Sequence, residues 1–257
     1  MVVANKRAEP MGDIPYTGHY ARLHHFTDAY YDGMARSYRR FIHRYLPQNK
    51  QARILDVGCG TGFLLNAIRR AGYSRSEGID ADRGQVKIGR DRGLPIQHVD
   101  VWKMKEYLTA KNGTVDAIVF VDVLEHIRKD EQIPTLKAIY SALAPGGRLI
   151  CQVPNALFVV GLYNRYMDWT HECLFSSESL AFVVENSGFT IERIEGGHDK
   201  PSPPRSILLN MLMSGFRSLL QFLTGMIWRL TILSWWGPAY VRHPIRANLI
   251  VVAVKER

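Results

Sequence analysis

Residues 54–65 read Ile54-Leu55-Asp56-Val57-Gly58-Cys59-Gly60-Thr61-Gly62-Phe63-Leu64-Leu65, and the fold can be predicted outward from them. The first four residues are apolar enough to form a buried strand. Three glycines then alternate with small residues, and an apolar run at helical spacing follows. A strand that turns through glycine into a helix places bare backbone and a helix N-terminus beside a ligand. The stretch therefore predicts a ligand site at the end of the first strand.

The composition indicates a globular protein with one large α/β domain or a domain with an appended element. The chain has 257 residues, of which 46% are hydrophobic and 22% charged. Its net charge of +9 permits a nucleic-acid or anionic-membrane partner, but without a concentrated basic block it favours neither. The three cysteines fit neither a disulfide framework nor a CxxC metal site, which predicts a cytoplasmic protein.

Strand and helix patterns alternate along the chain, which predicts an α/β fold with a parallel sheet and helices on both faces. The expected strands are 53–57, 76–80, 96–99, 115–121, 147–153, 189–194 and 247–254. The expected helices are 61–71, 83–92, 131–143 and 177–187. Residues 1–18 are expected to form a flexible tail. The aromatic-rich residues 19–46 predict an N-terminal helical cap, which either packs on the core or closes over a ligand.

Acidic residues lie within or at the ends of the first three strands, at positions that suit an adenosine ligand. Asp80 comes about twenty residues after the glycines, where a carboxylate can accept hydrogen bonds from both ribose hydroxyls. It could instead cap the next helix, a role open equally to Asp82. Asp100 could accept from an adenine amino group, with Val101 against the ring, or act as a solvated cap. Asp56 would orient the glycine loop or reach the ligand's amino group through water.

Four motifs in order resemble those of class I S-adenosylmethionine-dependent methyltransferases: LDVGCGTG, GID, DAIVFVDVLEHI and LAPGGRLICQVPN. The resemblance covers about residues 35–195 and the last strand. It implies a Rossmann-like seven-stranded sheet with the last strand antiparallel, and S-adenosylmethionine as the methyl donor. The cofactor contacts expected are Asp56, Gly58, Cys59, Gly60, Asp80, Ala81, Asp100, Val101, Val121 and Asp122. A dehydrogenase would need the spacing GxGxxG, which is absent here.

A second group of residues predicts the acceptor side. Asp122, Glu125 and His126 would share one face if they lie on a helix after the fourth strand, and His171 follows later. This set resembles that of small-RNA 2′-O-methyltransferases and of ubiquinone-pathway O-methyltransferases. The resemblance implies that the four residues hold a divalent metal, Mg, Mn or Zn, although Asp122 replaces the usual glutamate. Two other roles stay open: metal-free catalysis by His126, His171 and Glu125, or structural use.

Residues 203–242 form an apolar insert between the sixth and seventh strands of the methyltransferase domain, which would comprise 19–202 and 243–257. Arginines divide the insert into runs too short to span a bilayer. Its wide apolar face and terminal tryptophans suit an amphipathic helix in a membrane interface. An oligomer interface or packing on the host domain is the alternative, and a hairpin through the membrane would bury its arginines at high cost.

The segment DWTHE…FSSESL and the insert also resemble bacterial methyltransferases encoded with surface-polysaccharide assembly enzymes. That resemblance implies O-methylation of a saccharide or lipid-linked glycan hydroxyl by a cytoplasmic protein on the inner face of the membrane. Peripheral contact through 204–240 is expected; a homo-oligomer stays open, and a nucleic-acid partner is not expected. The alternatives are a quinone or other small-molecule O-methyltransferase, an RNA 2′-O-methyltransferase and a non-catalytic, cofactor-binding membrane scaffold.

Overall fold

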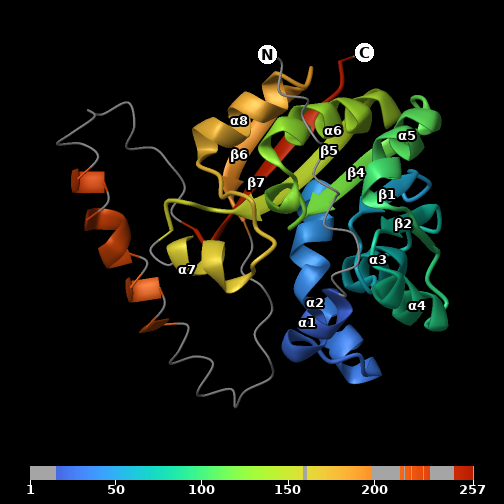
Figure 1. The fold of residues 1–257 in the computed structure, drawn as a ribbon, viewed down its shortest axis with the longest axis horizontal. Coiled ribbons are helices and arrows are strands. Elements are labelled where there is room, and N and C mark those ends of the chain that lie inside the picture. Colours follow the sequence, from blue (N-terminus) through green and yellow to red (C-terminus); the bar gives the residue numbers. More distant parts are fainter. Residues whose placement is uncertain are drawn as a thin grey trace, which may run out of the picture.

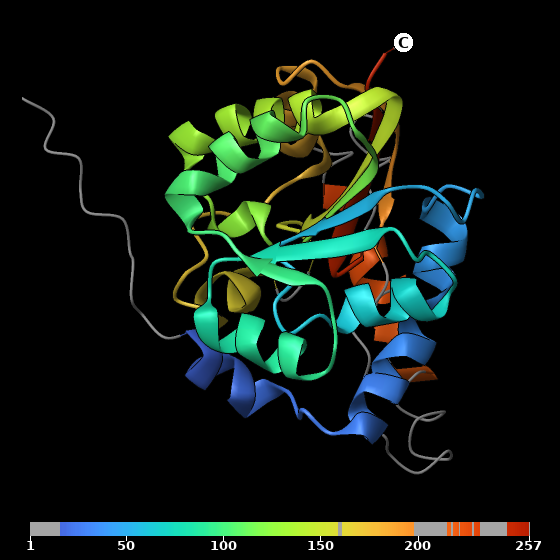
Figure 2. The same ribbon diagram turned by 90° about the vertical axis from the view of Figure 1, so that its right-hand side faces the viewer.

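A seven-stranded sheet runs through the middle of the molecule, with helices on both faces (Figures 1 and 2). The computed structural model describes residues 16–158, 161–197, 215–216, 218–220, 222–227, 229–231 and 246–256. The strands are β1 (Ile54–Val57), β2 (Ser76–Asp80), β3 (Ile96–His98), β4 (Val115–Val121), β5 (Leu143–Pro154), β6 (Thr190–Gly196) and β7 (Asn248–Val254). Their order is β3-β2-β1-β4-β5-β7-β6, and β7 runs antiparallel to both neighbours. The predicted fold class is confirmed.

The helices divide between the two faces of the sheet. One face carries α2 (Asp28–Tyr45), α3 (Phe63–Arg70) and α4 (Arg83–Asp91), preceded by α1 (Tyr16–Leu23). The other carries α5 (Val101–Lys111), α6 (Lys129–Ala142) and α8 (Ser177–Glu185). A 3-10 turn, η1 (Leu124–His126), follows β4, and the short α7 (Gly161–Met167) follows β5. Both faces of the sheet are therefore covered, as a mainly parallel sheet requires.

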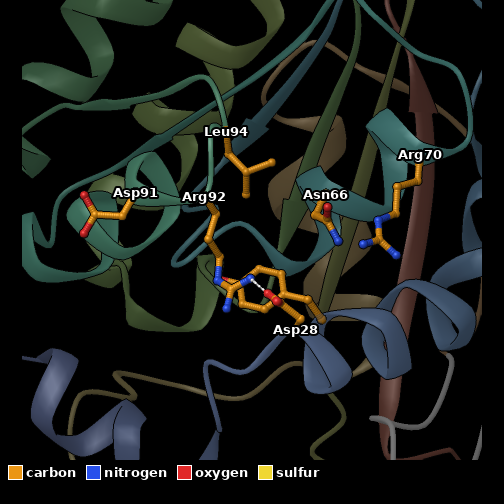
Figure 3. A pocket seen from close by; sticks show the side chains of 7 residues that line it. Asp28, Asn66, Arg70, Asp91, Arg92 and Leu94 are labelled. Atoms are coloured by element: carbon orange, nitrogen blue, oxygen red, sulfur yellow. Dashed lines mark hydrogen bonds and ion pairs between the residues drawn. The ribbon is translucent and has the colours of Figure 1, made fainter.

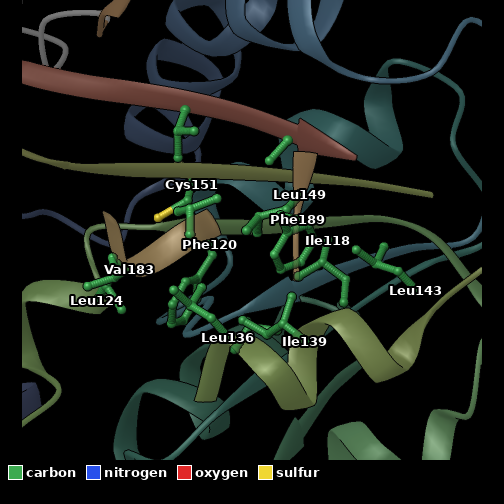
Figure 4. Close-up of a cluster of buried hydrophobic side chains, with 14 of the residues drawn as sticks. Ile118, Phe120, Leu124, Leu136, Ile139, Leu143, Leu149, Cys151, Val183 and Phe189 are labelled. Atoms are coloured by element: carbon green, nitrogen blue, oxygen red, sulfur yellow. The ribbon is translucent and has the colours of Figure 1, made fainter. Parts of the chain in front are cut away.

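Alternate side chains of β4 enter two separate hydrophobic clusters. Ile118 and Phe120 pack with Leu136 of α6 on one face (Figure 4). Val119, between them, packs on the other face with Phe41 of α2. These residues are wholly or almost wholly buried. The period of two along the strand thus fixes which helices each face can hold.

Local sequence signals set the start of several helices. The side chain of Asp82 accepts a hydrogen bond from the Gln85 N–H at 2.9 Å, which caps α4. Ser176 and Ser179 form a reciprocal capping box at the start of α8. Helix α5 was not predicted, because Leu108 is its one fully buried residue and it lacks a continuous apolar stripe. The early start of β5 at Leu143 was also missed.

The two segments predicted to lie outside the methyltransferase domain, the N-terminal tail and the apolar insert, are largely outside the described residues. Residues 1–15 and most of 203–242 belong to this undescribed part, and α1 begins at Tyr16, inside the range expected to be a tail. Within 215–231, every described residue is helical. Considering only the described residues, we find no helix that is both long and apolar enough to cross a membrane.

Candidate active site

The glycine loop closes over the ends of β1 and β2. The N–H groups of Gly58 and Cys59 both donate to the Ile79 carbonyl, at 2.8 and 3.0 Å. Gly58 has φ +72°, and a Cβ there would collide with the Val123 side chain. Gly60 has φ +56°, and its Cβ would lie 2.7 Å from Gln85 Oε1. Both positions therefore need glycine, for the backbone angle and for the close approach of neighbours.

Asp80 is bound into this loop, and Asp82 takes the helix-capping role that had been open to either residue. Asp80 Oδ2 accepts from the Gly60 N–H at 2.7 Å, and Oδ1 accepts from the Asp82 N–H at 2.8 Å. Burial raises the pKa of Asp80, against these two backbone hydrogen bonds. Each carboxylate oxygen has a further lone pair, so Asp80 can still accept from ribose hydroxyls.

Three buried oxygens around the loop have no hydrogen-bond partner among the described residues: Asp56 Oδ2, Thr61 Oγ1 and Gln85 Oε1. Burial, followed by the charge of Asp80, raises the pKa of Asp56 from 3.8 to about 7. Buried acceptors of this kind suit a ligand that brings donors, as the ammonium, ribose and adenine groups of S-adenosylmethionine do. The residues therefore fit this cofactor. Sequence reasoning missed Thr61 and Gln85, because nothing in the pattern showed that either oxygen would be buried beside the loop.

The remaining predicted cofactor residues surround the same strand ends. Asp100 precedes α5 without capping it through its side chain, and its Oδ1 lies 3.4 Å from His98 Nε2. The same His98 nitrogen is 3.0 Å from the Ala81 carbonyl oxygen. Val101 is 57% exposed, so its side chain is available to a ring. Cys59 Sγ faces the Gly60 carbonyl, and Val121 ends β4. Their ligand contacts stay predictions.

The N-terminal helices contact the loop directly. Tyr31 of α2 donates its hydroxyl to the Thr61 carbonyl at 2.8 Å. In α1, Thr17 N–H donates to Asp82 at 2.9 Å, and the Thr17 hydroxyl makes a further bond to the same carboxylate. The pKa of Tyr38 is raised by burial and then by the nearby charges of Asp122 and Asp56. The helical cap therefore packs on the core and also contacts the loop, while its closure over a ligand stays a prediction.

The chain after β4 differs from the helix that was expected. Asp122 adopts φ +55°, and its backbone N–H donates to the Gln152 carbonyl at 2.9 Å. Only a 3-10 turn, Leu124–His126, follows. The prediction that Asp122, Glu125 and His126 share one helical face is therefore wrong, since the left-handed residue turns the chain before any α-helix forms. Asp122 Oδ1 accepts a hydrogen bond from the Gln152 side-chain amide at 3.3 Å.

Three of the four predicted acceptor-side residues come together. Ligand atoms of Glu125, His126 and His171 lie within 4.8 Å of one another, and Asp122 is not in this group. The two imidazole rings are 4.7 Å apart between centroids, and His171 Nε2 lies 4.0 Å from Glu125 Oε1. The Glu172 N–H donates to the Glu125 carbonyl at 2.8 Å, which fastens the His171 segment to η1. We call these three residues the acid–histidine cluster.

Two residues of the acid–histidine cluster are buried and His126 is partly buried. Glu125 is fully buried and His171 nearly so. Burial, followed by the proximity of His171, lowers the pKa of His126 to about 4, against the opposing charges of Asp168 and Asp122. His126 is therefore neutral near pH 7, the form that accepts a proton or binds a metal. Two imidazoles and a carboxylate suit Zn, Mn or Mg as ligands, so three of the predicted residues fit such an ion.

Polar residues between β5 and His171 have mixed roles. The Asn164 carbonyl contacts His171 Nδ1 at 2.8 Å, and Arg165 donates to the Glu172 carbonyl at 3.2 Å. Tyr163 is largely exposed on α7. Asn155 is fully buried and bridges the chain by donating to the Arg246 carbonyl at 2.9 Å, which is a structural role.

A cavity of about 470 Å³ lies elsewhere, between α2, α3 and α4 (Figure 3). Its lining contains none of the predicted site residues: Asp28, Tyr31, Asn66, Arg70, Asp91, Arg92 and Leu94. Arg92 pairs with Asp28 at 2.6 Å and lies over the Tyr31 ring at 4.0 Å. No residue of the acid–histidine cluster lines this cavity, so the two are separate.

Comparison with known proteins agrees with this geometry. Residues 30–194 match the methyltransferase domain family. The ubiquinone biosynthesis O-methyltransferase of Xanthomonas axonopodis pv. citri (strain 306) is 29% identical over 160 residues, 56% of this chain and 65% of that protein. The chain thus spans slightly less than two thirds of this relative.

Solved structures show the same fold at low identity. A SAM-dependent methyltransferase from Archaeoglobus fulgidus has a TM-score of 0.60 and 20% identity, covering 88% of this chain and 94% of that one. Haemonchus contortus phosphoethanolamine N-methyltransferase 2, in complex with S-adenosyl-L-methionine, has a TM-score of 0.55 and 17% identity, covering 90% and 58%. With the domain match over residues 30–194, these likenesses show that the chain belongs to the class I S-adenosylmethionine-dependent methyltransferases.

Proposed function

We propose that this protein transfers a methyl group from S-adenosylmethionine to a hydroxyl oxygen. The observation that carries the proposal is the acid–histidine cluster, whose ligand atoms gather within 4.8 Å just after β4. A hydroxyl is a weak nucleophile until its proton is removed, so oxygen transfer needs a base or metal beside the acceptor. The relative from Xanthomonas, named an O-methyltransferase, supports the same reaction.

The chain's own residues would act mainly by positioning. S-adenosylmethionine supplies, when bound, a methyl group on a positively charged sulfur. The loop from Gly58 to Gly62 and Asp80 would hold the donor, and η1 would place the acceptor oxygen in line with the methyl carbon. S-adenosylmethionine would give its methyl group to the hydroxyl oxygen and leave as S-adenosylhomocysteine, and an imidazole nitrogen of the acid–histidine cluster would take the hydroxyl proton. Glu125 then stabilises the resulting imidazolium.

A divalent ion on the acid–histidine cluster is the second way to activate the hydroxyl. Glu125, His126 and His171 would hold it, and it would lower the pKa of a coordinated hydroxyl. Chelation followed by restoration with Mg, Mn or Zn, one at a time, separates the two schemes. Activity that survives complete metal removal would overturn the metal scheme and leave the imidazole as base.

The acceptor is a compound whose hydroxyl can reach the acid–histidine cluster. The Xanthomonas relative, a ubiquinone biosynthesis O-methyltransferase, favours an intermediate of ubiquinone biosynthesis over the saccharide or lipid-linked glycan expected from the sequence resemblance. A transfer assay with methyl-labelled S-adenosylmethionine should compare hydroxylated ubiquinone precursors, lipid-linked glycans and RNA. Label in the quinone precursor only is the expected result. Label in the glycan would restore the first expectation, and label in no hydroxyl compound would overturn O-methyl transfer.

We also propose peripheral membrane contact through the insert. Within 215–231 the described helical residues expose large apolar side chains: Phe216, Leu219, Leu220, Phe222, Leu223, Met226, Ile227 and Leu230. Arg229 is exposed beside them. An exposed apolar face with a basic residue suits the surface of an anionic bilayer. In Figure 1 these segments lie at the left of the view, and α4 and α5 lie at the right.

Co-sedimentation with vesicles of phosphatidylglycerol and phosphatidylcholine tests the membrane proposal. The double substitution Phe222→Ser and Leu230→Ser should abolish sedimentation. Phe182→Ser on α8 is the matched control, since Phe182 is 60% exposed and Phe222 68%. Equal sedimentation of the double variant and the wild type, or equal loss in the control, would overturn the proposal.

A further inference from the structure

Two residues outside the acid–histidine cluster stand directly behind His126. Asp168 is buried, and its Oδ1 accepts from both the backbone N–H of Thr170, at 2.9 Å, and the Thr170 hydroxyl, at 2.7 Å. Thr170 Oγ1 in turn lies 2.8 Å from His126 Nδ1. Asp168, Thr170 and His126 therefore form a chain of hydrogen bonds that leads to the first imidazole.

The direction of the proton in each bond follows from what each group can donate. A carboxylate only accepts, so the single hydroxyl proton of Thr170 points to Asp168. The Thr170 oxygen must then accept from His126, which places a proton on His126 Nδ1. On a neutral imidazole this leaves the lone pair on Nε2.

The second histidine is held in the same tautomer by a different acceptor. His171 Nδ1 lies 2.8 Å from the Asn164 carbonyl oxygen. A carbonyl cannot donate, so His171 also carries its proton on Nδ1. Its Nε2 then faces Glu125 Oε1 at 4.0 Å. When Glu125 is ionised and the imidazole is neutral, neither of these two facing atoms brings a proton, so a proton or cation between them is favourable.

We propose that Thr170, held by Asp168, is a positioning residue that locks His126 in the Nδ1–H tautomer that His171 also adopts. The acid–histidine cluster then presents two imidazole lone pairs and one carboxylate to a single proton or cation. In the opposite tautomer His126 would present an N–H to the acceptor and could neither take its proton nor bind a metal. The proposal deepens the function proposed above and rests on it for its catalytic consequence.

The alternative is that Thr170 only closes a turn. Its backbone bond to Asp168 spans two residues and would persist without the hydroxyl. Two substitutions separate the roles: Thr170→Val removes the hydroxyl and keeps the shape, whereas Thr170→Ser keeps the hydroxyl. Thr109→Val is the matched control, because Thr109 also donates its hydroxyl, to the Lys105 carbonyl at 2.8 Å, but lies on α5.

Nitrogen-15 NMR of the histidine rings reads the tautomer without any substrate. The wild type, Thr170→Ser and Thr109→Val should each show one protonated Nδ1 and one unprotonated Nε2 for His126, assigned with His126→Gln. Thr170→Val should show a mixture of tautomers. An unchanged His126 tautomer in Thr170→Val would overturn the proposal, and unchanged binding of S-adenosylhomocysteine checks that each variant is folded.

Kinetics and metal titration then measure what the Thr170 hydrogen bond to His126 contributes to activity or metal binding. Outer hydrogen-bond partners of such histidines typically change metal affinity or activity by about 10- to 100-fold. Thr170→Val should lower kcat, or weaken the binding of Mn²⁺ alone, within that range. Its KM for S-adenosylmethionine should stay unchanged. Thr170→Ser should keep the wild-type kcat and Mn²⁺ affinity. Equal damage by Thr170→Ser would overturn the proposal. Failure of O-methyl transfer itself is distinguishable, because the wild type would then be inactive while the NMR result still decides the tautomer.

Discussion

The donor side and the acceptor side of this site are built in different ways. Around the glycine loop, backbone groups make most of the hydrogen bonds. The N–H groups of Gly58 and Cys59 donate to the Ile79 carbonyl, and the Gly60 N–H donates to the Asp80 carboxylate. In the acid–histidine cluster, side chains from two separate segments meet, Glu125 and His126 after β4 and His171 after α7. A backbone site tolerates few changes but specifies only the donor, whereas a side-chain site can be rebuilt to suit another acceptor.

The largest expected effect separates chemistry from donor binding. Glu125→Gln and His126→Gln should each lower kcat by about 100- to 10,000-fold, because they remove a proton acceptor or its partner. Calorimetric affinity for S-adenosylhomocysteine should stay within about twofold, since neither side chain is part of the loop. Glu172→Gln, an exposed neighbour in the same contact, should leave kcat unchanged. A parallel loss of affinity would mean that the two sides are not independent.

The converse experiment breaks the donor side. Gly58→Val places a branched side chain at φ +72° and against Val123, and should weaken S-adenosylhomocysteine binding by about 100-fold. Gly33→Ala in α2 is the control: a Cβ there meets only Arg36 at 3.9 Å, and the helix should gain about 0.5–1 kcal/mol. Wild-type affinity in Gly58→Val would remove the loop from the donor site.

Asp56 offers a pH test of the donor side. A pKa raised from 3.8 to about 7 means that the native state holds this proton longer than the unfolded state. The contribution of the Asp56 carboxyl group to the free energy of unfolding is therefore fully present below pH 4 and is lost as the pH rises towards 7. Asp56→Asn should exceed the wild type in unfolding free energy by a gap that grows over that window to at most about 4 kcal/mol. Urea titrations at several pH values measure it, and a gap independent of pH would contradict the assignment.

The same variant should bind the donor less well. If Asp56 meets the ligand's ammonium group, Asp56→Asn should weaken S-adenosylhomocysteine binding by about tenfold at pH 8. At pH 6, where the wild-type carboxyl is largely protonated, the difference should shrink. Calorimetry at the two pH values decides, and an equal difference at both would show that Asp56 acts through the loop alone.

The smallest expected effect concerns the helical cap. Tyr31→Phe removes one hydrogen bond to the Thr61 carbonyl and should cost about 1 kcal/mol, or about fivefold in S-adenosylhomocysteine affinity. Tyr73→Phe removes a similar bond, to the Pro47 carbonyl at 2.7 Å, far from the loop. Stability should fall in both variants but affinity only in the first. Equal affinities would show that the cap packs without supporting the donor site.

The two sides also differ in how well the sequence predicts them. The strand, the glycines and Asp80 are close in sequence and follow a fixed spacing, so the fold and the donor end could be predicted from the pattern. The contribution of Asp168 and Thr170 could not, because it depends on a hydrogen bond between residues 44 positions apart. The placement of Asp122 beside Glu125 on a helix was wrong for a local reason, because the left-handed backbone of Asp122 prevents a helix from starting there. Gln85 could not be predicted as a site residue, because the burial of one side-chain oxygen leaves no periodic signal in the sequence.

The position of β7 has a consequence for how the chain folds. In the sheet, β6 has β7 as its neighbour, yet the chain runs from Gly196 to Asn248 between them. During synthesis β6 leaves the ribosome long before its pairing strand, and β5 presents an open edge for the same interval. Such distant pairing is slow and exposes strand edges to other chains. We expect the newly made protein to be most prone to aggregation in this interval, and its insert to emerge before the sheet is closed.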